Sequence, residues 1–447
     1  MRSHLSLALG GAAVMAAFGA SSAPAKEAVE IDARLGQRIL KERTTQRVYI
    51  RIGLKGARSE RAETRTPVNV ALVIDRSGSM AGDKIVKARE AAMMAIDRLS
   101  PRDIASVVIF DDRIDVLVPA TRVTDHGMFK DRIARGVTAR GSTAIYSAVE
   151  EGARELRKFK ASDRVNRVIL MSDGLANVGP SRPVDFAELG RRLGSEGIAV
   201  TTIGLGRDYN EDLMARLAGA SDGNHAYART GSDLVEFFNR EFDDVLSVSA
   251  QDIEIIIETR AGIRVLRSLG RDAEILPDRA RMQLNQVYSS GEHSLQFEME
   301  IPAEVASGEI ELARVKVSYS AGGTGGRHTV ETTVRARFST NDEEVRRSID
   351  PIVIEPILEL GARSRSARAI ELRDQGKLDE ARKELEENAA TLAREMETYG
   401  VQSSERLKAA REQSRKDADE VVSGDWQSQR KVMKQNLQNA PSAPSRY

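Results

Sequence analysis

Three short segments of the sequence carry carboxylate and hydroxyl side chains at spacings that could hold a metal ion. Asp75, Ser77 and Ser79 occupy alternate positions directly after an apolar run, while Thr143 and Asp173 follow in two later loops. These groups offer only oxygen, which suits Mg²⁺, or else Mn²⁺ or Ca²⁺, better than zinc or copper. Two carboxylates would cancel the charge of a divalent ion. If the hydroxyls make the direct contacts, the ion keeps its attraction for a further anion, which indicates adhesion rather than hydrolysis.

The elements that must position these residues alternate between apolar strands and amphipathic helices over residues 69–249. This alternation predicts an α/β fold with a Rossmann-like, doubly wound and mostly parallel sheet. One short connection, between 105–110 and 114–118, predicts an antiparallel hairpin. The expected strands are 69–74, 105–110, 114–118, 167–171, 199–203 and 225–228, and the expected helices are 84–99, 144–159, 186–193, 213–218 and 234–246.

In such a sheet, ligands bind beyond the carboxyl ends of the strands where the strand order reverses. Asp75 ends the first expected strand, Asp173 ends the strand after the long crossover, and Thr143 precedes a helix. The fold can therefore bring all three loops to one edge.

These motifs resemble the metal-ion-dependent adhesion site of von Willebrand factor type A domains. The resemblance rests on Asp75-x-Ser77-x-Ser79, on Thr143 in a Gly-Ser-Thr loop and on Asp173 in Ser-Asp-Gly, and it covers about residues 68–249. It implies Mg²⁺ held by these five side chains and a protein ligand whose Asp or Glu carboxylate enters the coordination shell. Arg76 and Gly78 would be loop positions and not ligands.

Outside that region, period-2 alternation predicts an antiparallel β-sandwich. It is clear over 293–301, 315–319 and 330–338, with further strands at 252–259 and 263–266 and a glycine-rich connection at 322–326. Residues 48–54 alternate in the same way ahead of the α/β region, so we expect that region to be inserted within the sandwich. Two amphipathic helices from Pro356 onward predict a helical hairpin. Its Gly376–Ala381 turn is similar to a tetratricopeptide turn, but a single hairpin cannot form a solenoid.

The N-terminus has the three parts of a signal peptide: Arg2, an apolar run over 5–20 and Ala23-Pro24-Ala25. We expect cleavage after Ala25 and a periplasmic or secreted location, since the run is short for a membrane anchor. The absence of cysteine excludes disulfides, zinc-thiolate sites and thiol catalysis. Acidic and basic residues number 67 each, so no overall charge favours nucleic acid or an anionic membrane.

Other polar residues have simpler interpretations. Asp111 and Asp112 could approach the same edge, but a hairpin turn explains them better. Asn177 could shape the rim or form a turn. His126 and His225 have no carboxylate at a telling spacing, and no nucleotide-binding or hydrolase motif occurs.

The chain as a whole is similar to bacterial exported relatives of inter-alpha-trypsin inhibitor heavy chains, including a group labelled "calcium-activated chloride channel homolog". Ion conduction is excluded, because no mature apolar run reaches spanning length. We expect a non-enzymatic protein-binding module; the alternatives are an envelope scaffold with a structural metal and a Mg²⁺-dependent hydrolase. The expected boundaries are a signal peptide over 1–25, an N-terminal segment over 26–66, a type A domain over 67–249, a sandwich over 250–345, a helical hairpin over 351–425 and a disordered tail over 426–447.

Overall fold

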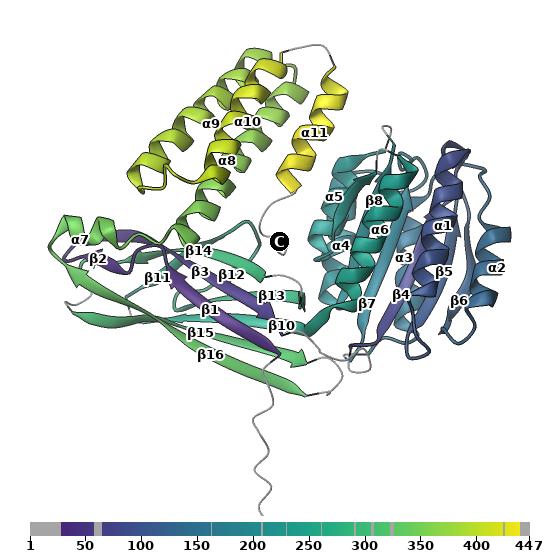
Figure 1. Ribbon diagram of the computed structural model, residues 1–447, viewed down its shortest axis with the longest axis horizontal. Helices are drawn as coiled ribbons and strands as arrows, with labels where there is room; N and C mark the ends of the chain where they lie inside the picture. The colour runs from purple at the N-terminus through teal and green to yellow at the C-terminus, as the bar shows by residue number, and fades with distance from the viewer. Residues whose placement is uncertain are drawn as a thin grey trace, which may run out of the picture.

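The chain folds into an α/β part, a β-sandwich and a group of helices above the sandwich (Figure 1). The computed structural model describes residues 28–57, 65–161, 163–206, 209–228, 230–260, 262–289, 292–304, 308–321, 326–422 and 425–438. The expected signal peptide, most of the glycine-rich connection and the end of the expected tail lie outside these residues.

The α/β part is built on a six-stranded sheet in the order β6-β5-β4-β7-β8-β9. All neighbours are parallel except β5 and β6, which pair antiparallel as predicted. Every residue of β4, β7 and β8 is buried, because helices cover both faces of the sheet. The predicted doubly wound fold is confirmed. The strands are β4 (Val68–Asp75), β5 (Ile104–Phe110), β6 (Ile114–Arg122), β7 (Val165–Ser172), β8 (Ile198–Leu205) and β9 (His225–Ala228).

Three helices pack on each face of this sheet. Helices α1 (Asp83–Asp97), α2 (His126–Gly136) and α6 (Gly231–Leu246) share one apolar cluster with it. Helices α3 (Ile145–Arg157), α4 (Pro183–Ser195) and α5 (Glu211–Ala220) share the other. Helix α2 was not predicted, because only Phe129 and Ile133 of its residues are buried and its periodic signal is weak.

The sandwich packs a four-stranded sheet, β1-β3-β14-β11, against a six-stranded one, β12-β13-β10-β15-β16-β2. Strand β3, which precedes the α/β part, pairs antiparallel with β14, which follows it. The α/β part is thus inserted within the sandwich. Strands β1, β2, β12 and β13 were not predicted. The bounds are β1 (Val29–Leu35), β2 (Ile39–Lys41), β3 (Gln46–Gly56), β10 (Val248–Thr259), β11 (Arg264–Leu269), β12 (Glu274–Ile275), β13 (Arg279–Tyr288), β14 (Glu292–Ile301), β15 (Glu309–Ala321) and β16 (Arg327–Ser339).

The C-terminal region has more helices than the predicted hairpin. After α7 (Asp342–Arg347), helices α8 (Pro351–Asp374) and α9 (Leu378–Thr398) form the expected pair, and α10 (Glu405–Glu420) packs beside them. Helix α11 (Trp426–Gln438) occupies a stretch where we expected disorder, and that prediction is wrong for these residues. Apolar side chains within this glutamine-rich stretch, Met433 and Leu437 among them, pack with Ile370 and Leu385 of the other helices. No helix of the described residues is long and apolar enough to cross a membrane.

The α/β part joins the sandwich through a buried polar network. Arg167 of β7 is fully buried and donates hydrogen bonds to Gln286 Oε1 and Tyr288 Oη of β13, both at 2.7 Å. Its Nη1 atom lies 3.0 Å from Glu241 of α6. Burial opposes the charge of Arg167, but Tyr288 and Glu241 outweigh that effect and raise its pKa. We call this network the buried junction.

Candidate metal centre

The two carboxylates of the predicted site lie at the ends of neighbouring strands. Asp75 is the last residue of β4, and Asp173 directly follows β7. These strands pair in parallel, and the strand order reverses between them, since β4 has β5 on its other side. The site therefore occupies the switch point of the sheet, where ligands bind in open α/β folds.

A chain of hydrogen bonds links four of the five predicted side chains. Asp75 Oδ1 accepts from the backbone N–H of Ser77 at 2.7 Å, and the hydroxyls of Ser77 and Ser79 are 3.1 Å apart. Ser79 Oγ then donates to Asp173 Oδ1 at 2.7 Å. The second oxygen of Asp75 accepts from Ser172, which ends β7. The Asp-x-Ser-x-Ser turn thus places both serine hydroxyls between the two carboxylates.

The fifth residue, Thr143, is held at the same place by the loop before α3. Its backbone N–H donates to Asn177 Oδ1 at 2.8 Å, so Asn177 fixes the position of this loop. A Cβ added at Gly174 would lie 2.8 Å from Thr143 Oγ1, which puts that hydroxyl against the turn after Asp173. The Gly141 carbonyl accepts from Gly78 N–H at 3.0 Å. The structure therefore brings all five predicted residues together.

Asp75 is a buried carboxylate in need of positive charge. Its exposed fraction is 0%. Burial raises its pKa to about 6, although hydrogen bonds from Ser172 and Ser77 lower it, and the charge of Asp173 raises it further. Among the described residues, no cationic side chain forms an ion pair with it. A buried charge without a partner is costly, so a bound cation would stabilise this arrangement.

Lys84, which the sequence did not single out, places a positive charge beside the second carboxylate of the candidate metal centre. Lys84 Nζ, in the first turn of α1, pairs with Asp173 Oδ2 and lies 3.3 Å from the Ser79 carbonyl. Its ammonium group is a stand-in for a cation at this edge. Nothing in the sequence marks Lys84, since a lysine at a helix start is ordinary. The donor set, two carboxylates and three hydroxyls with a lysine ammonium on one carboxylate, fits a hard divalent cation.

The neighbouring acids have structural roles. Asp111 accepts from the Arg113 N–H at 2.7 Å, as a hairpin turn requires, and it lies 2.8 Å from both Arg76 and Arg140. The Arg76 side chain therefore points to Asp111 and not to the candidate metal centre. This agrees with the interpretation of Arg76 as a loop residue. Asp112 lies beside Gly141, whose φ of +70° and lack of a Cβ let the two loops approach closely.

The two histidines considered in the sequence also have structural partners. The ring of His225 lies 2.8 Å from Thr202 Oγ1, and burial lowers its pKa to about 4. His126 Nε2 is 3.0 Å from the Leu99 carbonyl. Within the described ranges, no cluster of three or more histidine, cysteine or acidic side chains has a metal-binding arrangement.

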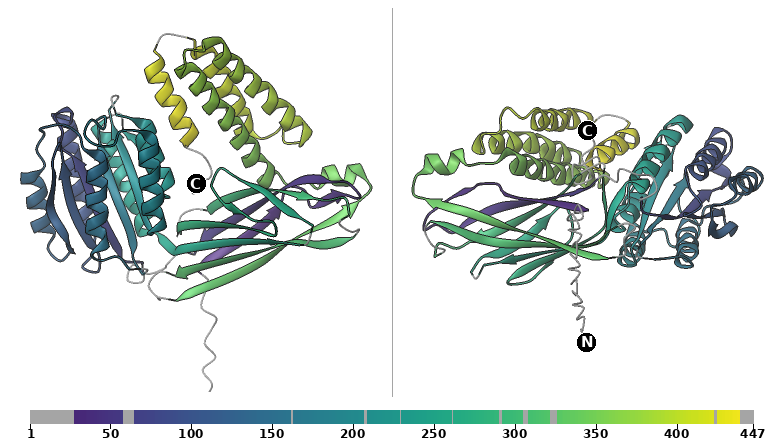
Figure 2. Two further views of the ribbon diagram at one scale, coloured as in Figure 1. Left: turned by 180° about the vertical axis from the view of Figure 1, so that it is seen from behind. Right: turned by 60° about the horizontal axis from the view of Figure 1, so that its bottom comes forward.

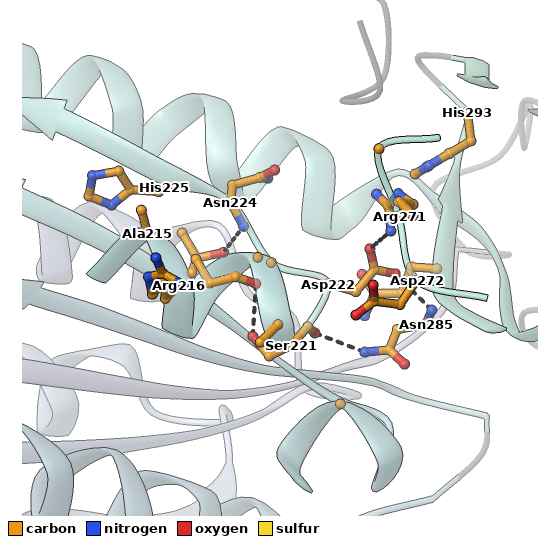
Figure 3. A pocket seen from close by; sticks show the side chains of 18 of the residues that line it. Ala215, Arg216, Ser221, Asp222, Asn224, His225, Arg271, Asp272, Asn285 and His293 are labelled. Atoms are coloured by element: carbon orange, nitrogen blue, oxygen red, sulfur yellow. Dashed lines mark hydrogen bonds and ion pairs between the residues drawn. The ribbon is translucent and has the colours of Figure 1, made fainter. Parts of the chain in front are cut away.

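A separate cleft of about 1530 Å³ lies between the α/β part, the sandwich and the helices (Figure 3). None of the five predicted metal residues lines it. Its walls are tied together by Arg271, which lies 2.6 Å from Asp222, and by Asn285, whose N–H donates to the same carboxylate at 2.8 Å. Burial would raise the pKa of Asp222, but Arg271 outweighs it and the pKa is lowered. These contacts belong to the attachment between the two parts.

Comparison with known proteins identifies the domain that contains the five candidate metal residues. Residues 69–240 match the family model for the von Willebrand factor type A domain. An uncharacterised protein of Synechocystis is 30% identical over 215 residues, which is 48% of this chain and 50% of that one. Human inter-alpha-trypsin inhibitor heavy chain H4 is 33% identical over 35% of this chain and 17% of its own length. The chain thus spans half or less of these relatives.

The fold extends beyond the matched residues. A solved structure described as von Willebrand factor type A from Catenulispora acidiphila superposes with a TM-score of 0.67, covering 86% of this chain and 89% of that one at 17% identity. At this identity the likeness shows the fold alone. Together with the family match and the sheet order, it shows that residues 69–240 of this chain form a von Willebrand factor type A domain.

Proposed function

We propose that the type A domain captures a protein ligand through a divalent cation, Mg²⁺ in the first instance, bound at the metal centre. Type A domains generally mediate protein–protein interaction. The observation that carries the metal-dependent form is the buried carboxylate of Asp75, which has no paired cation among the described residues and is linked through two serine hydroxyls to Asp173.

The residues that would hold the ion are Asp75, Ser77, Ser79, Thr143 and Asp173. When bound, the ion would supply a centre that attracts an anion, and an Asp or Glu of the partner is the matching group. Ser172 and Asn177 would keep Asp75 and the Thr143 loop in position. The resulting activity is adhesion and not turnover.

Loss of either carboxylate should abolish cation binding and ligand capture. Asp75→Ala and Asp173→Ala each leave one carboxylate, too little negative charge to hold a divalent ion against water. We expect wild-type protein to bind Mn²⁺, measured by calorimetry, and to retain proteins from a periplasmic extract in an EDTA-sensitive manner. Both signals should disappear in the two variants.

Asp112→Asn is the matched control, since it removes an exposed carboxylate from the adjoining loop and should change neither signal. Capture that persists in EDTA and in both variants would contradict the proposal. If the ion raised the melting temperature while capture was unaffected by either variant, a scaffold with a structural metal would replace it.

We also propose that the protein is exported, on the strength of the signal-peptide pattern over residues 1–25. N-terminal sequencing of the mature chain should begin at Lys26. A mature chain that retains Met1 would contradict export by this route.

A further inference from the structure

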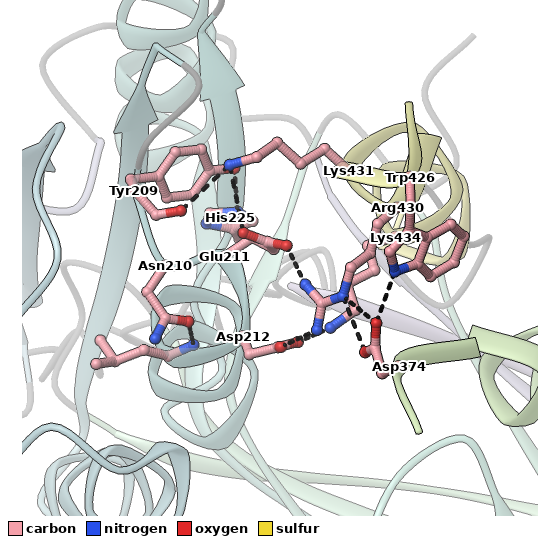
Figure 4. A network of polar contacts seen from close by, with 11 residues as sticks. Tyr209, Asn210, Glu211, Asp212, His225, Asp374, Trp426, Arg430, Lys431 and Lys434 are labelled. Atoms are coloured by element: carbon pink, nitrogen blue, oxygen red, sulfur yellow. Dashed lines mark hydrogen bonds and ion pairs between the residues drawn. The ribbon is translucent and has the colours of Figure 1, made fainter. Parts of the chain in front are cut away.

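Helix α11 has two faces that contact different parts of the molecule. Its apolar side, with Met433 and Leu437, packs on the other C-terminal helices. Its basic side, Arg430, Lys431 and Lys434, meets the start of α5 in the type A domain (Figure 4). In Figures 1 and 2 the helix lies between the type A domain and the other C-terminal helices. It is therefore a second attachment, separate from the buried junction.

In the type A domain, the charged contacts of this attachment are made by two carboxylates, Glu211 and Asp212. Arg430 pairs with Glu211, lies 2.6 Å from Asp212 and also lies 2.9 Å from Asp374 at the end of α8. Lys434 pairs with Asp212 as well. One arginine thus joins the type A domain to the C-terminal helices, and the acids of one side meet the bases of the other.

An aromatic contact extends the same surface. Lys431 Nζ lies 4.7 Å from the ring centre of Tyr209 and 3.3 Å from its carbonyl oxygen. A cation over an aromatic face is attracted by the negative potential of the ring. We call Tyr209, Glu211 and Asp212 the acidic face.

The acidic face lies at the same edge of the sheet as the metal centre, because α5 begins beyond the carboxyl end of β8. Gly206 follows that strand, and a Cβ added there would lie 3.2 Å from Lys84 Cε. Lys84 in turn pairs with Asp173. Gly206 therefore lies near Lys84, and the acidic face follows it closely in the sequence.

We propose that α11 is a removable clasp that docks on the acidic face and, while docked, favours the pairing of Lys84 with Asp173. Since that ammonium competes with a metal ion for the carboxylate, release of the clasp should tighten metal binding. By linkage, metal binding should loosen the clasp to the same degree. This second step rests on the proposed function, whereas the docking itself does not.

The basic face of α11 should separate from the type A domain more easily than its apolar face separates from the other C-terminal helices. The side chains of Arg430, Asp212 and Asp374 are 21%, 31% and 33% exposed, whereas that of Glu211 is 11% exposed. Ion pairs that water reaches contribute little and are screened by salt. The apolar face excludes water and has no such dependence. Release should therefore part α11 from the type A domain and leave it on the helices.

The docking can be measured directly because the chain contains no cysteine. Spin labels on Val184→Cys of α4 and Val432→Cys of α11 occupy exposed positions outside the contact. We expect a narrow distance distribution at low salt. Lys434→Asp and Asp212→Lys should each broaden it, and the two changes combined should narrow it again in part, because the pair between positions 212 and 434 is re-formed while Arg430 remains beside position 212.

Lys416→Asp is the matched control, since it reverses an exposed base on α10 for which the structure gives no ion pair, and it should leave the distribution narrow. If both single variants keep the wild-type distribution, the acidic face does not hold α11 and the clasp is wrong.

The single tryptophan of the chain reports the other face of α11. Trp426 Nε1 donates to Asp374 at 2.9 Å, and the Arg373 guanidinium lies 5.2 Å from its ring. Its emission should be unchanged in Asp212→Lys. A shift towards the emission of free tryptophan would mean that α11 has left the helices as well, which overturns a clasp hinged on them.

Metal affinity tests the coupling. Mn²⁺ should bind severalfold more tightly to Asp212→Lys than to wild type, and the affinity of the charge-exchanged double variant should return towards the wild-type value. Equal affinities in all three would overturn the coupling while the distance measurement still decides the docking. No Mn²⁺ binding to wild type would overturn the metal centre and the coupling together, again without touching the docking result.

Discussion

The type A domain is attached to the rest of the chain in two ways that differ in their access to water. At the buried junction, Arg167 is fully buried and binds Glu241, Gln286 and Tyr288. At the clasp, Arg430 joins Asp212 and Asp374, which are partly exposed to solvent, and Glu211, which is buried. Both use an arginine as the central group. Burial decides what each arginine contributes.

The buried arginine fixes geometry, and the partly exposed one permits change. Breaking an ion pair that is removed from water leaves an uncompensated buried charge, so such a pair holds one arrangement. An exposed pair exchanges with water at little cost. The two attachments also lie at opposite ends of the sheet, since the junction adjoins the chain connections to the sandwich and the clasp adjoins the metal edge (Figure 1). On this proposal, the domain is held firmly at its base and adjustably beside the candidate metal centre.

The largest expected effect comes from removing the buried arginine. Arg167→Met keeps much of the volume but leaves the charge of Glu241 buried without its partner. Breaking a buried pair in this way costs about 3–5 kcal/mol of the free energy of unfolding. Urea denaturation followed by circular dichroism would measure it.

Two further variants sharpen the comparison with the clasp. Arg167→Met combined with Glu241→Gln removes both charges and should recover part of the loss. Lys434→Ala, at the partly exposed attachment, should cost less, about 1 kcal/mol, and the cost should fall as salt is added. Equal losses from Arg167→Met and Lys434→Ala would remove the distinction between the two attachments.

The difference between the two regions also explains what the sequence could predict. Of the candidate metal residues, Asp75 and Asp173 follow strands whose apolar runs are unmistakable, and Thr143 precedes a helix. The topology of such sheets brings these positions together, so the residue pattern alone suffices to place Asp75, Thr143 and Asp173 at one edge. The strand containing Arg167 was predicted, but its partners in β13 lie more than a hundred positions away. A residue pattern carries no information about such a pairing.

Other omissions have similar physical causes. Strand β13 buries Ala280, Met282 and Leu284 on one face, but it carries Arg279 and Arg281 on the other and its small apolar side chains give a weak signal. Helix α11 has a polar, glutamine-rich sequence that we interpreted as disordered. It is held by tertiary contacts on both of its faces, and helix propensity alone does not show them.

A smaller effect, the change of stability with pH, should distinguish the buried junction from the clasp, because the charges at the clasp do not change over the same pH range. His293 lies beside the buried junction, where its ring stacks on Tyr288 at 5.8 Å between centroids and faces Arg271 and Asp222. Neither ring nitrogen has a hydrogen-bond partner among the described residues. Burial lowers the pKa of His293 to about 4, the nearby Arg271 lowers it further, and Asp222 opposes them.

Between pH 6.5 and 4 the unfolded chain therefore binds a proton at His293 that the folded chain does not. The free energy of unfolding should fall as the pH falls through this window, by about 1–3 kcal/mol from this group, and should be fully recovered above pH 6.5. His293→Phe keeps the stacking, loses no hydrogen bond and should flatten that slope. His225, with a similarly lowered pKa, remains in both proteins, so their difference isolates His293.

The docking of the clasp should not change between pH 6.5 and 4.5. Burial would raise the pKa of Asp212, but Lys434 and Arg430 outweigh it and lower the pKa below its usual value of 3.8. Its contribution to stability is therefore present above that value and is lost only as the pH falls below it. The distance between labels on α4 and α11 should stay narrow from pH 6.5 to 4.5 while the urea midpoint falls. A distribution that broadens over the same interval would mean that the two attachments are linked and do not act separately.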